Sequence, residues 1–386
     1  MVGLDECPVC EEPLERLLDI AGVPVMTTVV WPTADQARHA AAGDLHLGIC
    51  PSCGLIRNRA FDAALVAYDA SYENSQHFSP TFRAHAHDLV TDLASRYSLA
   101  GSTVVELGCG KGEFLSMLSE VAGCRGLGFD PTYDGEVDDT PGDVTIVRAL
   151  FGPTSPHVDA ALVCSRHVLE HVEDPVAFLR DLRSSVEPGT PVYIEVPDGG
   201  YVLSAGGLWD LIYPHVSYFT APSLELMLRH CGFDVTSVRS VFDGQFLAVE
   251  AVVADREPTE VAADAAAVAP VLAAARRMPQ LFDETVGRWR AVVAEPDGRS
   301  TVVWGAGAKG VSFLNFVDGG DHVDAVVDLN PRKHGTFVPG TSYEVVAPKQ
   351  LAGTDVGRVV VMNPAYRDEI SRDLRALGLD AQILCV

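Results

Sequence analysis

The chain has 386 residues, 47% of them hydrophobic and 21% charged, which fits a globular protein of roughly two to four domains and excludes a disordered or fibrous chain. It carries 28 Lys and Arg against 53 Asp and Glu, a net charge of −25 that disfavours nucleic acid or a membrane surface as partner. Met1–Glu6 lack the basic and apolar regions of a signal peptide, so none is expected, and no run approaches the roughly 18 apolar residues of a membrane span. We therefore expect a cytoplasmic protein.

Four segments follow one another along the chain. Residues 1–78 carry two Cys-x-x-Cys pairs and little periodicity, whereas residues 79–254 alternate strand-like apolar runs with helical patterns, which predicts an α/β unit around a parallel sheet. Residues 255–298 are rich in Ala, Val and Glu and predict two helices broken near Pro279. Residues 299–386 return to alternation and predict a second, smaller α/β unit.

The two cysteine pairs at the amino end are Cys7 with Cys10 and Cys50 with Cys53. Each short turn can present two thiolates to one ion, and two such turns complete a tetrahedral site. The pattern predicts one structural zinc, with a redox pair as the alternative. Four thiolates close the coordination sphere, so this ion has no open position for catalysis.

A glycine-rich turn follows the first strand of the segment 79–254. Gly108, Gly110 and Gly112 let the backbone approach a ligand closely, and Glu106 ends the strand before them. Asp130 follows a second strand, twenty positions after Gly110, where a carboxylate can accept hydrogen bonds from ribose hydroxyls. The pattern alone fits a nucleotide-type cofactor, including NAD.

His167-Val-Leu-Glu170-His171 follows a later strand and matches the zinc-binding pattern H-x-x-E-H. On a helix the two histidines would share one face, but no third ligand is evident in the sequence. His171 is therefore interpreted either as a residue of the cofactor cleft or as a buried or capping histidine.

The second α/β unit also opens with a glycine-rich turn. Gly305, Gly307 and Gly310 satisfy G-x-G-x-x-G directly after a strand, and Asp328 follows the next strand. By itself this pattern predicts an NAD site.

Taken together, the chain resembles the nucleotide-sugar C-methyltransferases, which act on deoxyhexoses linked to thymidine diphosphate. The marks of the resemblance are the double Cys-x-x-Cys, Tyr72–Gln76, the turn 106–112 with FDP at 129–131, HVLEHV (167–172), LIYPHVSYF (211–219) and WGAGAKG (304–310). It covers essentially the whole chain. It implies a zinc-binding domain, a class I (Rossmann-like) methyltransferase domain that uses S-adenosylmethionine, and a C-terminal Rossmann-like domain.

The resemblance also implies roles for the two glycine-rich turns. Glu106 would help to hold the methionyl amino end of S-adenosylmethionine, and the residues near Ala149 and Leu150 would flank its adenine. In this family the C-terminal domain closes over the nucleotide-sugar without nicotinamide chemistry. The turn with Gly305, Gly307, Lys309 and Gly310 would then hold the diphosphate of a small-molecule acceptor, or be a structural remnant.

C-methylation in this family has two events: a base removes a proton beside a keto group, and the enolate carbon attacks the sulfonium methyl in line. The roles fall on a tyrosine, a histidine after the fourth strand and a Tyr-x-Glu-His cluster. By position these are Tyr72, His171 and the stretch that ends at His215, the expected general base.

This sequence departs from the family in that last cluster. Ile212 stands at the tyrosine position and Pro214 at the glutamate position, while Tyr213 lies one residue from the expected tyrosine. Pro214 cannot orient His215 through a carboxylate. The departure leaves open an O- or N-methyltransferase acting on another small molecule, and a non-catalytic ligand-binding protein.

Overall fold

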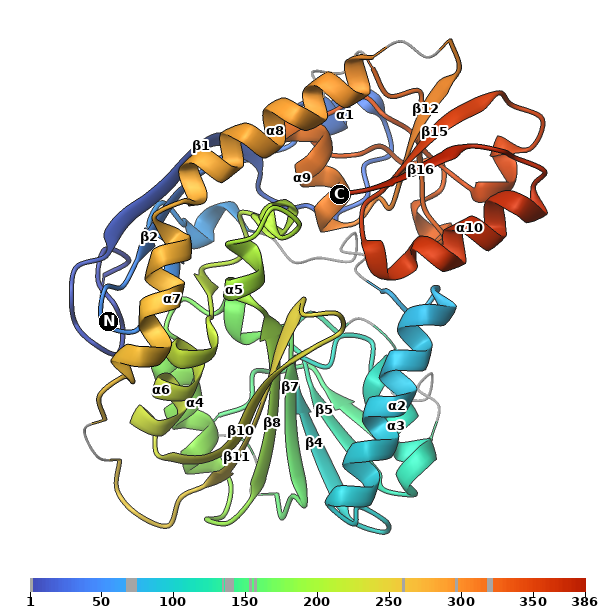
Figure 1. Cartoon of the computed structure of the whole chain (residues 1–386). Helices are drawn as coiled ribbons and strands as arrows, with labels where there is room; N and C mark the ends of the chain where they lie inside the picture. The colour runs from blue at the N-terminus through green and yellow to red at the C-terminus, as the bar shows by residue number, and fades with distance from the viewer. Residues whose placement is uncertain are drawn as a thin grey trace.

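The structure is a computed structural model that describes residues 3–66, 75–133, 135, 142–152, 155, 158–258, 261–295, 298–317 and 322–386. Tyr72 lies outside the described residues. Figure 1 shows a large central sheet flanked by helices, with the C-terminal α/β unit beyond one end of its strands. The N-terminal strands and two later helices run along the side of both units.

The central sheet has seven strands in the order β10-β11-β8-β7-β4-β5-β6. Its strands are β4 (Thr103–Leu107), β5 (Arg125–Phe129), β6 (Val144–Val147), β7 (Leu162–Arg166), β8 (Pro191–Pro197), β10 (Phe233–Val241) and β11 (Phe246–Val253). The strands from β8 to β6 are parallel, and β10 and β11 form an antiparallel hairpin at the edge. This is the class I methyltransferase arrangement, so the fold expected for the middle of the chain is confirmed.

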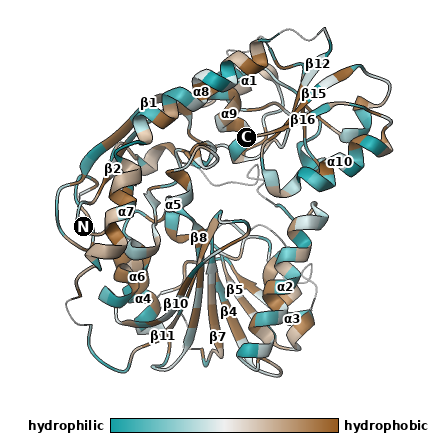
Figure 2. Ribbon diagram, in the orientation of Figure 1, coloured by the Kyte–Doolittle hydropathy of each residue, from teal (hydrophilic) through white to brown (hydrophobic). Residues whose placement is uncertain are grey.

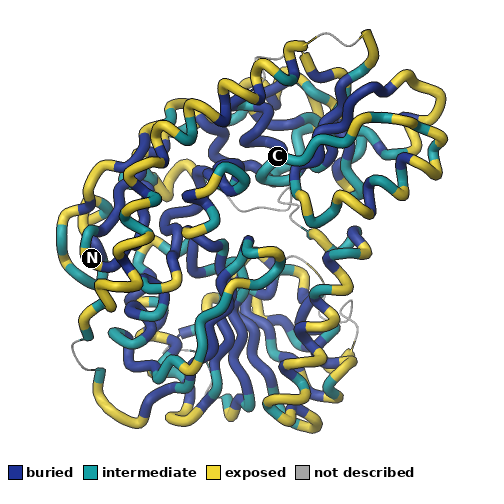
Figure 3. The backbone as a smooth tube through the Cα atoms, viewed as in Figure 1, coloured by how far each residue is buried: buried dark blue, intermediate teal, exposed yellow. Residues whose placement is uncertain are grey.

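Helices cover both faces of this sheet. Figure 1 places α2 (Pro80–Arg96) and α3 (Glu113–Ala122) on one side, and α4 (Pro175–Ser185) and α6 (Ala221–His230) on the other, with the short α5 (Gly199–Val202) near the end of the sheet that faces the C-terminal unit. Because both faces are covered, the inner strands are apolar runs rather than alternating ones. They are brown in Figure 2 and dark blue, hence buried, in Figure 3.

The N-terminal sheet has the order β1-β2-β3-β9 and is antiparallel. It consists of β1 (Glu15–Pro24), β2 (Ala42–Ile49) and β3 (Ile56–Asn58), with α1 (Ala34–Arg38) between the first two, and is completed by β9 (Ser217–Tyr218). The last strand comes from a segment that the sequence places in the middle unit. The N-terminal unit is therefore joined to the methyltransferase domain through the backbone that follows His215.

The helical segment consists of α7 (Ala265–Ala275) and α8 (Met278–Ala294), and Pro279 lies in the first turn of α8, which confirms the predicted break. The C-terminal sheet is wholly parallel, in the order β14-β13-β12-β15-β16. Its elements are β12 (Ser300–Trp304), α9 (Ala308–Val317), β13 (Ala325–Val327), β14 (Val345–Val346), β15 (Val356–Val361), α10 (Arg367–Ala376) and β16 (Gln382–Cys385). In the part of the chain that the structure describes, no helix has the length and apolar character needed to cross a bilayer.

Candidate active site

A cavity of about 420 Å³ lies where the three units meet. Its walls include residues of both glycine-rich turns, which follow β4 and β12. In parallel α/β sheets, ligands bind at the carboxyl ends of the strands, and both turns occupy that position. Most of the other lining residues lie in segments 75–82, 166–171, 210–215, 328–333 and 362–370, and Thr27 and Thr28 of the N-terminal unit also contribute.

The turn after β4 requires glycine on steric grounds. A Cβ on Gly108 would lie 2.2 Å from Cγ2 of Val168, and the backbone there has φ +67°. Gly108 and Gly110 line the cavity, whereas Gly112 caps the start of α3 with φ +76°. The geometry expected of a close backbone approach to a ligand is therefore present.

Asp130 fixes this turn. Its carboxylate Oδ2 accepts a hydrogen bond from the backbone N–H of Gly110 (2.8 Å), and Oδ1 accepts from the N–H and the hydroxyl of Thr132 (2.8 and 2.7 Å). The side chain is buried beneath the turn and is not among the residues that line the cavity. A role in ribose binding stays a prediction, and the structure adds a second role in holding the turn.

Replacing Asp130 by Ala is expected to weaken S-adenosylmethionine binding by roughly tenfold or more, since hydrogen bonds to a charged group contribute about 1.5–3 kcal/mol. Titration calorimetry measures the loss. Glu120→Ala, an exposed change on α3, is the matched control and should bind normally. Unchanged affinity in Asp130→Ala would remove both roles.

The two residues expected beside adenine are not brought to this cavity. The side chain of Leu150 is 78% exposed, and the backbone N–H of Ala149 donates to the carbonyl of Val147 (2.8 Å). Contact of Ala149 and Leu150 with adenine stays a prediction.

A buried charge network forms the floor of the cavity. The guanidinium of Arg166 lies 2.9 Å from Oε1 of Glu195, and Nε2 of His167 lies 3.2 Å from the same oxygen. Burial by itself would lower the pKa of His167, but the nearby carboxylates of Glu170 (3.7 Å) and Glu195 (3.2 Å) outweigh it and raise the pKa to about 9. Burial raises the pKa of Glu106 to about 7.

The H-x-x-E-H segment does not form the helical zinc motif. Leu169–His171 is a single 3₁₀ turn, so His167 and His171 do not share a helical face. The ring of His167 packs on Phe246 at 4.6 Å between centroids, whereas Nδ1 of His171 lies 3.0 Å from the carbonyl oxygen of Pro214.

His171 and His215 meet in the cavity wall, with ring centroids 4.9 Å apart in an edge-to-face arrangement. His215 is 7% exposed, and its Nδ1 has no hydrogen-bond partner among the described residues. Burial, followed by the charges of His171, His167 and Lys309, lowers the pKa of His215 well below its usual value. His215 is therefore neutral at physiological pH.

Glu170 lies beside this pair and was not singled out as a site residue by the sequence. It is 1% exposed, it lines the cavity, and neither carboxylate oxygen has a hydrogen-bond partner in the described part of the chain. Thus a carboxylate stands near His215 although the preceding residue is Pro214. The signal was present inside the H-x-x-E-H pattern, but its proximity to His215 is a tertiary contact.

Tyr213 points away from the cavity. Its hydroxyl accepts from the backbone N–H of Asp62 (2.9 Å) and donates to the carbonyl of Ala60 (3.3 Å), and its ring stacks on Phe61. The structure thus places Tyr213 in the packing of the N-terminal unit, while its neighbours Ile212 and Pro214 line the cavity.

The turn after β12 has the compact geometry of a nucleotide-binding turn. A Cβ on Gly310 would lie 1.9 Å from the carbonyl oxygen of Gly305, so only glycine allows this contact of helix and strand. Gly305, Gly307, Lys309 and Gly310 all line the cavity. The ammonium of Lys309 is paired with the carboxylate of Asp210.

The four cysteines of the N-terminal unit converge. Their four sulfur atoms all lie within 4.8 Å of one another, in Cys7, Cys10, Cys50 and Cys53. Sγ of Cys7 is 3.7 Å from Sγ of Cys53. This donor set fits a structural zinc, which would cross-link the two loops. The loops pack into the same core as Leu107 and Phe219 of the methyltransferase domain.

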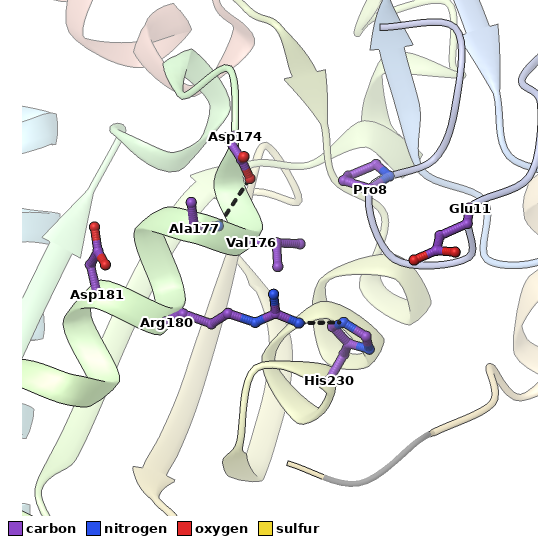
Figure 4. A pocket seen from close by; sticks show the side chains of 8 residues that line it. All are labelled: Pro8, Glu11, Asp174, Val176, Ala177, Arg180, Asp181 and His230. Carbon is purple, nitrogen blue, oxygen red and sulfur yellow. Dashed lines mark hydrogen bonds between the residues drawn. The ribbon is translucent and has the colours of Figure 1, made fainter. Parts of the chain in front are cut away.

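A second, smaller hollow of about 380 Å³ lies between the first cysteine loop and helices α4 and α6. Figure 4 shows Arg180 and His230 pointing toward one another there, with their side-chain nitrogens 3.1 Å apart. It contains neither glycine-rich turn.

Comparison with protein families gives two matches. Residues 56–238 match the family described as "Methyltransferase domain", and residues 249–382 match "C-methyltransferase C-terminal domain". Together with the fold and the turn after β4, these matches indicate an S-adenosylmethionine-dependent methyltransferase. The second match supports a C-methyltransferase family and covers the G-x-G-x-x-G that resembles an NAD site.

Solved structures similar to the chain include S-adenosylmethionine-dependent methyltransferases from Mesorhizobium loti (19% identity, 42% of this chain and 96% of that one, TM-score 0.35) and Aquifex aeolicus (17%, 46% and 95%, 0.35). Another is the Burkholderia thailandensis 1,6-didemethyltoxoflavin-N1-methyltransferase with bound 1,6-didemethyltoxoflavin and S-adenosylhomocysteine (17%, 46% and 82%, 0.36). Similarity at this level carries no argument about the acceptor. No curated protein matches the chain.

Proposed function

We propose that the protein transfers the methyl group of S-adenosylmethionine to a carbon atom next to a keto group in a nucleotide-linked sugar. The observation that carries the proposal is the continuity of one cavity from the methyl-donor turn, past His171 and His215, to the turn after β12. A donor, a reacting carbon and an anionic handle could occupy it in that order.

The C-terminal side of the cavity suits an anionic group. Lys309 and Lys333 both line it, and a phosphate could replace the carboxylate of Asp210 as the partner of Lys309. Nζ of Lys333 donates to the carbonyl of Ala306 (3.1 Å) and lies 3.5 Å from Oδ2 of Asp328. These contacts hold the ammonium beside the glycine-rich turn, where backbone N–H groups can also bind phosphate.

Proton removal from carbon requires a base and a group that stabilises the enolate oxygen. The neutral His215 and its neighbour His171 supply imidazole nitrogens in the cavity wall, and Glu170 supplies a carboxylate beside them. This supports the C-methyltransferase proposal over an O- or N-methyltransferase, because the carboxylate lost at Pro214 has a substitute in space. Tyr72, Gly305, Gly307 and Gly310 keep their proposed roles.

Calorimetric titration with S-adenosylmethionine, S-adenosylhomocysteine, thymidine diphosphate and NAD tests the proposal. We expect binding of the first three and no binding of NAD, followed by methylation of a 4-keto sugar nucleotide. Binding of the methyl donor without thymidine diphosphate would contradict the nucleotide-sugar acceptor. Binding of NAD without the methyl donor would overturn the whole assignment.

The affinity for S-adenosylmethionine is expected to rise with pH until about pH 7. The donor's ammonium group favours ionised Glu106, whose pKa is about 7 when the donor is absent, so at lower pH binding must expel a proton. The steepest change is about tenfold per pH unit. Calorimetry across pH 5–8 measures the slope, which Glu106→Gln should abolish.

Glu106 also affects the stability of the fold, with a pH dependence opposite to that of donor binding. The folded chain keeps the proton of Glu106 up to about pH 7, whereas the unfolded chain releases it near 4.5. Because the folded state then binds more protons, its stability from this group falls as the pH rises between those values.

A further inference from the structure

We propose that Glu170, His171 and His215 form a second metal site, which binds a divalent transition ion such as Zn²⁺ and leaves a coordination position open toward the cavity. Two imidazoles and one carboxylate are a ligand set used by catalytic zinc and by non-haem iron. The site differs from the four-cysteine cluster, whose thiolates leave no position for a substrate.

The geometry brings the three ligands together from two segments. One ligand atom from each residue lies within 4.8 Å of the other two. Metal–ligand bonds of about 2 Å at tetrahedral angles separate ligand atoms by roughly 3.4 Å, so a small movement of side chains closes the set. A backbone hydrogen bond from the N–H of Val216 to the carbonyl of Glu170 (2.8 Å) fixes the two segments together.

Unsatisfied polar atoms point to a missing ligand. Both carboxylate oxygens of Glu170 and Nδ1 of His215 are buried without hydrogen-bond partners among the described residues. Glu170 is 1% and His215 7% exposed. Buried polar groups are otherwise almost always paired, because leaving one unpaired costs about 1–3 kcal/mol. A cation in the cavity would satisfy the carboxylate and an imidazole lone pair at once.

The orientation of His171 also suits a ligand. Its Nδ1 lies 3.0 Å from the carbonyl oxygen of Pro214, which can only accept a hydrogen bond, so Nδ1 carries the proton. In the neutral ring the lone pair is then on Nε2, which lies 4.0 Å from Oε1 of Glu170. Metal-binding histidines are commonly oriented by such a hydrogen bond from the second ring nitrogen to a backbone carbonyl.

The ring of His167 lies beside the proposed site and does not occupy it. Nδ1 of His167 lies 3.7 Å from Oε1 of Glu170, but its Nε2 is closer to Glu195, at 3.2 Å. Phe246 packs against the ring from another side. Oε1 of Glu170 thus lies near both His167 and His171, whereas Oε2 has no hydrogen-bond partner among the described residues and is the oxygen left for an ion.

The role of the ion, though not its binding, rests on the function proposed above. A divalent ion at this position would withdraw electron density from a keto oxygen of the acceptor and so acidify the adjacent C–H, and a hydroxide ion held on the metal would take that proton and become water. In that arrangement the two imidazoles act on the acceptor through the ion rather than as free bases. It would also give Pro214 a use, since its carbonyl orients His171.

The test is the metal content of the full-length protein after equilibration with Zn²⁺, measured by elemental analysis, together with calorimetric titration by Zn²⁺. We expect the wild type to hold one ion more than the four cysteines account for. Glu170→Gln and His215→Ala should weaken the additional site by at least about 100-fold, the upper end of the loss for a supporting residue. His87→Ala, an exposed histidine on α2, is the matched control.

Each variant must keep the cysteine-bound zinc and bind S-adenosylmethionine, which shows that it is folded; Glu170→Gln keeps the side-chain shape and provides the second folded variant. Absence of the additional ion, or its retention in both variants, would overturn the metal site. Neither result contradicts the proposed methyl transfer. A metal-free protein that still methylates a keto sugar would refute the metal site alone. Conversely, a bound ion without any sugar-nucleotide binding would refute the proposed acceptor alone.

Discussion

His215→Ala is expected to lower turnover by about 100-fold or more while S-adenosylmethionine affinity stays nearly unchanged. Loss of a group on which proton removal in the transition state depends typically costs 10²–10⁴-fold, and this holds whether His215 is the base itself or a ligand of the ion proposed above. The imidazole lies in the wall shared with His171 and Ile212, whereas the donor turn begins at Gly108, after a different strand. The change should therefore affect kcat far more than donor binding.

The measurement is methyl transfer to the keto sugar nucleotide, with donor affinity determined in parallel. His230→Ala is the matched control: this histidine contacts Arg180 in the separate hollow shown in Figure 4. It should turn over normally. A His215→Ala enzyme with the wild-type rate would exclude this residue from proton transfer and from activation of the acceptor.

Cys50→Ser is expected to release the structural zinc, unfold the N-terminal unit and abolish turnover, while much of the donor affinity remains. Structural zinc contributes about 10 kcal/mol or more in small metal-dependent domains. Cys50, buried between β2 and β3, cannot be replaced as a ligand by a hydroxyl of comparable affinity.

Unfolding of the N-terminal unit should also disturb the acceptor side of the cavity, because backbone hydrogen bonds connect the two. The N–H of Asn58 on β3 donates to the carbonyl of Val216 (2.9 Å), and the N–H of Val216 donates to the carbonyl of Glu170. Without β3, His215 and Glu170 lose this support. Gly108 and Gly110, in the turn after β4, do not depend on β3 and should keep their positions.

Zinc content, thermal unfolding and methyl transfer report the effect together. Cys385→Ser makes the same substitution in β16, outside the cluster, and should leave zinc content and turnover intact. Full turnover by a zinc-free Cys50→Ser protein would show that the N-terminal unit does not position the acceptor site.

The sequence predicted the central fold because its signals are local. Apolar runs such as β4 and β7 are covered on both faces, and a glycine turn at Gly108 is required by a close contact, so each leaves a direct trace in composition. Likewise the paired cysteines predict their own convergence, since two short loops can meet at one ion.

The candidate site was predicted less completely because its parts are brought together by tertiary contacts. Glu170 and His215 are separated along the chain and meet through the Val216 hydrogen bond. Tyr213, adjacent in sequence to the expected position, instead stacks on Phe61 of the N-terminal unit. Neither the proximity of Glu170 to His215 nor the packing of Tyr213 can be predicted from the spacing of these residues in the sequence.

The α/β class, the cysteine cluster and the two glycine-rich turns can be predicted from the sequence, because each depends on residues close along the chain. That both turns open into one cavity, and that β9 joins the N-terminal sheet, is visible only in the folded molecule. The same holds for the carboxylate that stands beside His215 despite Pro214. The physical reason is that the cavity is built by packing three units against one another, and long-range packing leaves no periodic pattern in the sequence.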